Sequence, residues 1–335
     1  MRDARPLVRA LVDPVSVDRF DGADWTAVIA CARAESLIGG LAHRLEGRYL
    51  PDAVADIMAD ARRSAAQARV HALWEAEMAG RALAGLNIPV ILLKGTAYAA
   101  AGLDAADGRS IGDLDILVPR TALDRVEEAL LTAGWEWVKD NAYDQLYYRR
   151  WMHELPPMIH RGRDRMIDVH HTILPPTARP KPDVEALIED SVALANGLRV
   201  LSPPDKIVHA AAHLFADGDL AGGLRNLWDI DRLVRRYDAP AFRDRLAERA
   251  RLHGLSSHVA RALRLARSLY ETPVDPHLAG RERLGDGLFE RRLLARDGWG
   301  RECSKLLRFS FYVRSHWIRM PPLLLARHLW NKARA

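Results

Sequence analysis

The stretch that most constrains this chain of 335 residues lies between residues 87 and 119. It opens with an apolar run at residues 89–93, bounded by a proline and a glycine, which predicts a short buried strand. Lys94, Gly95 and Thr96 then break the run. We expect Gly95 to take a backbone conformation closed to other residues, and Thr96 to offer a hydroxyl and an amide where a helix begins at residues 97–101. The sequence therefore predicts a phosphate-binding turn.

A second predicted strand, at residues 111–118, carries two aspartates. Asp113 and Asp115 are two positions apart, so their side chains share a face of the strand and converge on one spot. Two such charges repel each other when partly desolvated, and a divalent cation relieves that repulsion. Mg²⁺ favours carboxylate and phosphate oxygens together. The alternative is a solvated turn that leads into a strand, and the glycine turn one strand earlier favours the metal site.

Together these residues resemble a known family. Gly95-Thr96 followed by Asp113-Leu114-Asp115 resembles the turn and the paired aspartates of the nucleotidyltransferase superfamily, which has the DNA polymerase β-like catalytic fold. More narrowly, the segments LLKGTAY, GRSIGDLDILV and MIDVHHTIL resemble the bacterial group labelled "uncharacterised nucleotidyltransferase family protein". The close resemblance covers residues 90–174, and a weaker one covers residues 201–237. It is more specific for the fold than for the substrate.

The superfamily pattern has a third carboxylate on a later strand, and the matching residue is Asp168. Relatives in the narrow group often carry glutamate there, so Asp168 is a shorter version. The resemblance implies that Asp113, Asp115 and Asp168 are catalytic residues that bind Mg²⁺ or Mn²⁺. A carboxylate on the surface of a strand is the alternative for Asp168.

Two basic residues also match the family pattern, Lys94 before the glycine and Arg109 before the aspartate pair. A guanidinium grips phosphate oxygens in a fork, and a lysine neutralises charge on the leaving pyrophosphate. We therefore expect Lys94, Gly95, Thr96 and Arg109 to bind the nucleotide. For both basic residues the alternative is a surface charge or an ion pair with the aspartates.

Several polar residues beyond this stretch are candidates for the acceptor side of the site. His170 follows Asp168, although a strand histidine is more often structural. His209 and His213 are one helical turn apart, but the sequence offers no third ligand that would make them a zinc site. Arg225 and Asp229 share a helix face, which is typical of a salt bridge. We name His170, His213 and Asp229 as acceptor-side candidates.

The remaining pattern predicts an α/β (α+β) fold with a small mixed sheet, flanked by N-terminal helices and a C-terminal helical domain. Residues 25–86 have apolar positions at helical spacing, and Glu35 and His43 there read as exposed or capping groups. Aromatic and alternating segments around residues 143–151, 154–160 and 165–173 read as strands. A proline-rich segment at residues 172–182 reads as a linker. The predicted units are residues 1–87, a helical buttress; 88–175, the catalytic core; and 183–335, the helical domain.

Composition limits the partners and the compartment. The formal net charge of +5 suits phosphate-bearing ligands, but the arginines are scattered and no nucleic-acid motif appears, so nucleic acid is not favoured. Cys31 and Cys303 lie far apart and favour a reducing compartment, so we expect a cytoplasmic protein. No apolar run approaches membrane-spanning length. The final segment, residues 305–335, reads as closing helices of a domain, with an interfacial membrane helix as the alternative.

The sequence thus predicts a Mg²⁺-dependent nucleotidyltransferase. It would transfer a nucleoside monophosphate from a nucleoside triphosphate to an unknown acceptor, which we expect to be a small molecule, a peptide or a protein. Pyrophosphate would be released. Two alternatives stay open: a transferase of another group from a nucleotide-linked donor, and a non-catalytic module that senses nucleotides or binds proteins.

Overall fold

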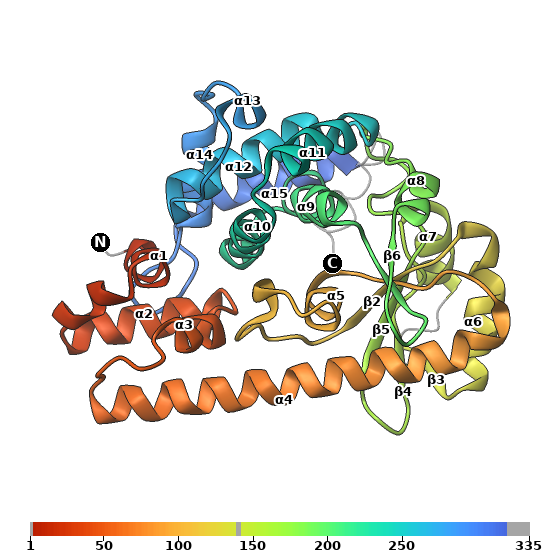
Figure 1. Ribbon diagram of the computed structural model, residues 1–335, viewed down its shortest axis with the longest axis horizontal. Helices are drawn as coiled ribbons and strands as arrows, with labels where there is room; N and C mark the ends of the chain where they lie inside the picture. Colours follow the sequence, from red (N-terminus) through yellow and green to blue (C-terminus); the bar gives the residue numbers. More distant parts are fainter. Residues whose placement is uncertain (1–2, 139–141, 320–335) are drawn as a thin grey trace.

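The computed structural model describes residues 3–138 and 142–319. Figure 1 shows the N-terminal helices at one end, the sheet at the other, and the C-terminal helices above both. The long helix α4 runs along the base and links the two ends.

The N-terminal part is helical, as the periodicity predicts. Helix α4 holds 32 residues, mostly helix formers, and buries a stripe that includes Met58 and Ala76. It contacts α3 as well as α5, α6 and β2, so it supports the sheet as a buttress. The elements are α1 (Arg5–Val12), η1 (Pro14–Arg19), α2 (Gly22–Ala34), α3 (Ile38–Arg44), α4 (Asp52–Leu83) and the 3₁₀ turn η2 (Ala84–Leu86).

The sequence suggested that Glu35 and His43 are exposed or capping groups. Glu35 is not exposed, because only 2% of its surface is accessible, whereas His43 is exposed as predicted. Its carboxylate accepts hydrogen bonds from the Arg296 Nε at 2.7 Å and from the Leu224 backbone N–H at 3.2 Å. Both donors come from distant segments, so local sequence gives no sign of them. Glu35 therefore ties the N-terminal helices to the C-terminal ones.

The strands of the described residues form one mixed sheet of seven strands, in the order β3-β4-β5-β2-β1-β7-β6. The pairs β2–β5 and β1–β7 are parallel and the other neighbours are antiparallel. The strands are β1 (Ile91–Leu92), β2 (Leu114–Leu117), β3 (Trp135–Trp137), β4 (Met158–His160), β5 (Met166–His170), β6 (Val192–Ala193) and β7 (Arg199–Val200). Because β7 pairs with β1, the sheet extends beyond the predicted core of residues 88–175. The division into three units stays a prediction.

The segments between the central strands position the site. After β1 come α5 (Lys94–Ala100) and the turn η3 (Asp104–Ala106). After β2 come η4 (Arg120–Ala122) and α6 (Leu123–Thr132).

The aromatic content of residues 143–151 suggested a strand, and this prediction is wrong. The segment is part of helix α7 (Ala142–Trp151). Aromatic residues favour strands only weakly, and tertiary context overrides that preference. Arg149 donates to Gln145 one turn earlier and to Glu127 of α6, contacts that the helical form allows.

Helices make up most of the chain beyond the sheet. They are α8 (Val184–Glu189), α9 (Pro203–Ala212), the π-helical turn η5 (His213–Asp217), α10 (Gly223–Tyr237), α11 (Pro240–Leu252), α12 (Ser256–Tyr270), α13 (Pro276–Ala279), α14 (Asp286–Leu293) and α15 (Lys305–Arg319). Helix α15 packs on η5, where Arg314 donates to the Phe215 carbonyl, yet Leu306 and Phe309 face outward. Among the described helices none is both long and apolar enough to cross a membrane. The rest of the predicted final segment, residues 320–335, lies outside the described residues.

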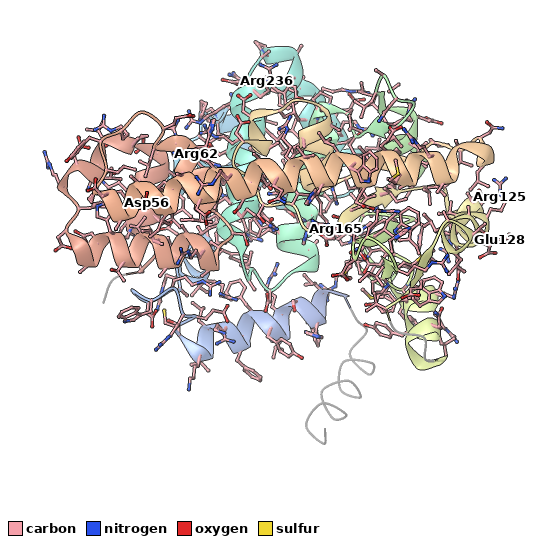
Figure 2. All side chains as sticks on the ribbon, turned by 90° about the horizontal axis from the view of Figure 1, so that it is seen from below. Asp56, Arg62, Arg125, Glu128, Arg165 and Arg236 are labelled. Carbon is pink, nitrogen blue, oxygen red and sulfur yellow. The ribbon has the colours of Figure 1, made fainter. Side chains whose placement is uncertain are left out.

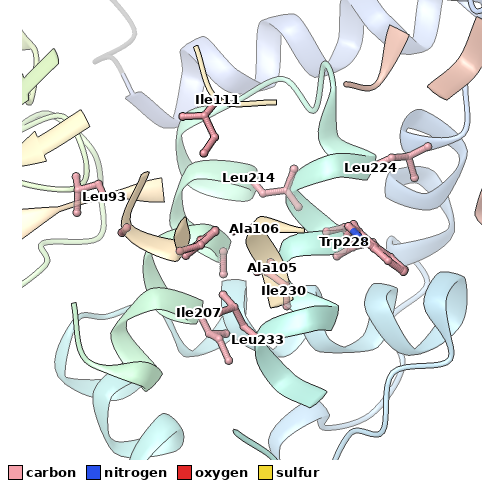
Figure 3. Close-up of a cluster of buried hydrophobic side chains, with 14 of the residues drawn as sticks. Leu93, Ala105, Ala106, Ile111, Ile207, Leu214, Leu224, Trp228, Ile230 and Leu233 are labelled. Atoms are coloured by element: carbon pink, nitrogen blue, oxygen red, sulfur yellow. The ribbon is translucent and has the colours of Figure 1, made fainter. Parts of the chain in front are cut away.

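One hydrophobic cluster joins the segment before β2 to the C-terminal helices. Figure 3 shows Ala105, Ala106 and Ile111 of that segment together with Leu214 and Trp228 of η5 and α10. All are buried. Burial of apolar surface therefore holds the chain just before the aspartates against the helical part.

Charged side chains are spread over the molecule. In Figure 2 the labelled Arg62, Arg125 and Arg236 come from three different helices, α4, α6 and α10, and Arg125 lies well away from the other two. These arginines do not form the single basic stripe that is typical of a nucleic-acid interface.

Candidate active site

Three carboxylates meet where β2 and β5 lie side by side. Asp115 on β2 pairs in register with Asp168 on β5, and Asp113 precedes β2 by one residue. One oxygen from each of the three carboxylates lies within 4.8 Å of the others. Asp115 is buried, Asp168 is partly buried and Asp113 is exposed, so the group opens towards solvent at Asp113. The structure therefore brings together all three predicted carboxylates.

Two basic side chains hold Asp115. The Lys94 Nζ lies 2.6 Å from its Oδ1, and the His170 Nε2 lies 3.0 Å from the same oxygen. Burial disfavours the charge on Asp115, but the Lys94 ammonium and the His170 ring more than offset this and hold the pKa of Asp115 well below its usual range. Both contacts go to Oδ1, so among the described residues neither of these basic groups occupies the second oxygen, which could bind a cation.

Asp168 has no such partner among the described residues. Burial, and then the charges of Asp115 and Glu154, raise the pKa of its carboxyl to about 7. The site thus carries more negative charge than its own basic groups balance. Three carboxylates with an excess of negative charge suit a hard divalent cation, so the donor set fits Mg²⁺.

The turn after β1 differs from its prediction in one respect. Lys94, not Gly95, has a positive φ, of 49°. Gly95 is required for another reason: a Cβ there would lie 2.5 Å from the Arg109 Nε. Thr96 is buried, and its hydroxyl has no hydrogen-bond partner among the described residues. Helix α5 starts at Lys94, earlier than the predicted start at residue 97. The Arg109 side chain lies against Gly95.

Arg109 is buried, and its guanidinium donates to Asp229 of α10. It also lies over the Tyr98 ring, 5.6 Å from the ring centroid. The Asp229 carboxylate is thus paired with Arg109 instead of the predicted Arg225. A pair separated by 120 residues in sequence has no signature in local spacing.

Comparison with protein families then identifies the chain. Residues 21–271, well over half of it, match the family described as "Uncharacterised nucleotidyltransferase". The chain belongs to this family. A search of curated proteins finds no match. The match spans the sheet, all three carboxylates and helix α10, and it confirms the resemblance seen in the sequence.

Arg225 is a residue of this family member that the sequence pattern did not single out for the site. It is partly buried, and it has no hydrogen-bond or ion-pair partner among the described residues. Burial, followed by the neighbouring Arg109, lowers the pKa of its guanidinium, and Asp113 and Asp229 act in the opposite sense. A cation next to another cation and near the carboxylates is an arrangement that an anionic ligand would stabilise.

The acceptor-side candidates differ in what they contact. His170 is bound to Asp115, and Asp229 is bound to Arg109, so both are engaged within the protein. His213 begins η5, and its Nδ1 has no partner among the described residues. Burial, and then the charge of Lys94, lower the pKa of His213 well below its ordinary value. Of the three, His213 is the neutral ring that a ligand could still engage.

Loss of Arg109 should destabilise the protein, because Asp229 would remain buried without a partner. We expect Arg109→Ala to lower the free energy of unfolding by about 3–5 kcal/mol in urea denaturation. The double variant Arg109→Met with Asp229→Leu should recover most of this loss, since no buried charge remains. Arg63→Ala, which removes an exposed pair with Asp60, serves as the control and should cost about 0–1 kcal/mol. Equal losses for Arg109→Ala and Arg63→Ala would contradict the role of the buried pair.

Asp168 should make the cation-free protein less stable as the pH rises. Its folded pKa, about 7, is above the ordinary 3.8, so the folded state holds this proton more tightly than the unfolded chain does. The contribution of Asp168 to the free energy of unfolding is then fully present below about pH 4 and is lost as the pH rises towards 7. Asp168→Asn should lack this fall. Melting temperatures measured across this pH range with a chelator provide the test, with Asp56→Asn, at an exposed site on α4, as the control. Matching curves for Asp168→Asn and wild type would contradict the prediction.

Proposed function

We propose that this protein is a Mg²⁺-dependent enzyme that transfers a nucleoside monophosphate from a nucleoside triphosphate to an acceptor and releases pyrophosphate. The observation that carries the proposal is the convergence of Asp113, Asp115 and Asp168 on neighbouring strands. Membership of the nucleotidyltransferase family supports the reaction class. The order of the central strands, with both carboxylate-bearing strands side by side, is consistent with a polymerase β-like catalytic fold.

The three aspartates would hold the cation, Mg²⁺ or Mn²⁺. When bound, the cation would polarise the α-phosphate and carry the charge of the triphosphate. Lys94 and His170 keep Asp115 ionised and fix its orientation through Oδ1. Asp168 would take up the proton that the acceptor loses.

The basic and polar groups next to the aspartates would hold the triphosphate. Arg109 lies against Gly95, and the unpartnered Thr96 hydroxyl belongs to the same turn of α5. Arg225 supplies a second guanidinium from α10, and within residues 3–138 and 142–319 no carboxylate forms an ion pair with it. We propose that these groups bind the phosphates, so that a nucleotide would bridge the sheet and the C-terminal helices.

The reaction forms one bond and breaks one. An oxygen or nitrogen of the acceptor bonds to the α-phosphorus as the bond from that phosphorus to the bridging oxygen of the β-phosphate breaks. Pyrophosphate leaves with the bond electrons, and the acceptor's proton goes to Asp168. Holding the two reactants together in line is the main contribution of the protein.

The acceptor is proposed by chemical class alone. A small molecule, a peptide or a protein would each supply a suitable oxygen or nitrogen. We propose that His213, whose Nδ1 has no partner among the described residues, contacts it. Nucleic acid is not favoured, since the arginines are scattered along the sequence and no nucleic-acid motif appears. A cytoplasmic location is part of the proposal because Cys31 and Cys303 are both free thiols.

Release of pyrophosphate tests the proposal. The protein is incubated with Mg²⁺, a labelled nucleoside triphosphate and a cell extract, and released pyrophosphate and any labelled product are measured. We expect both with wild type and neither with Asp113→Asn or Asp168→Asn. Transfer of label without pyrophosphate would favour a different transferase. Nucleotide binding without either product would favour a sensing module.

Arg225 should contribute to triphosphate binding. Loss of one charged contact to phosphate costs about 1.5–3 kcal/mol, so Arg225→Ala should weaken binding by about ten- to a hundredfold in calorimetry with Mg²⁺. The matched control is Arg236→Ala, on the exposed side of the same helix, which should bind as wild type does. The thermal midpoints of both variants report whether each is folded. Unchanged affinity in a folded Arg225→Ala variant would exclude this role.

A further inference from the structure

We propose that His153, Glu154 and His170 form a binding site for a divalent transition metal such as Zn²⁺, separate from the three aspartates. The site does not rest on the proposed function, since its ligands and its test concern metal binding alone. One candidate ligand atom from each of the three residues lies within 4.8 Å of the others.

The backbone places these residues on two adjacent chain segments. The Leu155 N–H donates to the Val169 carbonyl, and the His171 N–H donates to the His153 carbonyl, both at 2.9 Å. Between these bonds Glu154 and His170 form an antiparallel bridge. The ligands therefore come from backbone that the end of β5 holds in register, which is the kind of support that a metal site requires.

The distances between the side chains suit a cation among them. The His170 Nδ1 lies 3.4 Å from the Glu154 Oε2, and the His153 Nε2 lies 3.8 Å from the same oxygen. Ligand atoms that are each about 2.0–2.2 Å from one Zn²⁺ are roughly 3–4 Å from one another. Only a small adjustment would bring all three to one ion.

One buried nitrogen of this cluster needs a partner. The Nδ1 of His170, which lies 3.4 Å from the Glu154 Oε2, has no hydrogen-bond partner among the described residues, and its ring is more than nine-tenths buried. In His153, which is buried to a similar extent, the nitrogen that faces Glu154 is Nε2. The other nitrogen of His170 faces the Asp115 carboxylate. If that nitrogen carries the proton, the Nδ1 lone pair is directed at Glu154, which is the carboxylate–histidine–metal arrangement. The alternative is a doubly protonated His170 between two carboxylates.

The ligand set determines which metal class fits. Two imidazoles and one carboxylate favour Zn²⁺, Co²⁺, Fe²⁺ or Ni²⁺, whereas Mg²⁺ and Mn²⁺ suit oxygen ligands and water. The aspartates and this site should therefore select different ions even though Asp115 and His170 touch.

The experiment uses the full chain, stripped of metal and dialysed against Zn²⁺ with a large excess of Mg²⁺. We expect wild type to retain one Zn²⁺ per chain, as measured by atomic emission, and calorimetry to give an affinity at least about tenfold higher than that of His153→Ala or Glu154→Gln. Asp113→Asn, in the other cluster, and His277→Ala, an exposed histidine on α13, are the controls and should retain the ion. The proposal would be overturned if Mg²⁺ displaced Zn²⁺ from the wild-type protein. It would also be overturned if the His153→Ala and Glu154→Gln variants retained Zn²⁺ as the wild type does.

A second measurement covers the case in which those variants do not fold. X-ray absorption at the zinc edge of the wild-type complex should show two imidazole ligands. A spectrum with oxygen ligands alone would assign the ion to the aspartates and overturn the proposal. No stoichiometric zinc in the folded wild-type protein would favour the doubly protonated His170.

Discussion

The buried ion pair between Arg109 and Asp229 is the contact on which the site depends. It joins the segment before the aspartates to helix α10, two parts of the chain that also meet in the hydrophobic cluster of Figure 3. A buried charge without its partner costs several kcal/mol, so neither the segment nor the helix can leave this position cheaply. Gly95 belongs to the same arrangement, because a side chain there would occupy the place of the Arg109 guanidinium. The position of the aspartates relative to the C-terminal helices thus follows from this pair and from the apolar surface around it.

The electrostatics of the site divide its charges into two groups. Asp115 and Asp229 are each paired with basic side chains within the protein, and these pairs are part of the fold. Asp168 and Arg225 lack such partners among the described residues, one on the sheet and one on α10. An unpaired carboxylate and an unpaired guanidinium are costly in a folded protein unless a ligand supplies the opposite charge. A cation that carries a triphosphate supplies both charges, which is the reason the proposed function accounts for both groups at once.

The sequence predicted what depends on local pattern. Alternation along the strands placed Asp113 and Asp115 together, and the resemblance added Asp168, which lies opposite Asp115 in register. The sequence did not predict the partner of Arg109 or the burial of Glu35, because Arg109 and Glu35 both contact residues that lie far away in the chain. Aromatic content at residues 143–151 suggested a strand, but strand propensity is weak and depends on context. In the structure this segment belongs to helix α7, and its Arg149 contacts Glu127 of α6. The spacing predicted that Arg225 forms a salt bridge with Asp229, because spacing alone cannot show that Arg109 is paired with that carboxylate.

His170 connects the two clusters of candidate ligands. One of its nitrogens contacts Asp115 at 3.0 Å, and the other faces Glu154 at 3.4 Å. A metal on His170 would fix the tautomer that donates to Asp115, and it would remove the alternative in which His170 is doubly protonated. The charge that balances Asp115 would then depend on whether the metal is present. Thermodynamic linkage requires the dependence to be mutual: if a metal at His170 changes the affinity of the aspartates for Mg²⁺, Mg²⁺ changes the affinity of His170 for its metal by the same factor. A single histidine is thus sufficient to couple the two sites, with no movement of the backbone required.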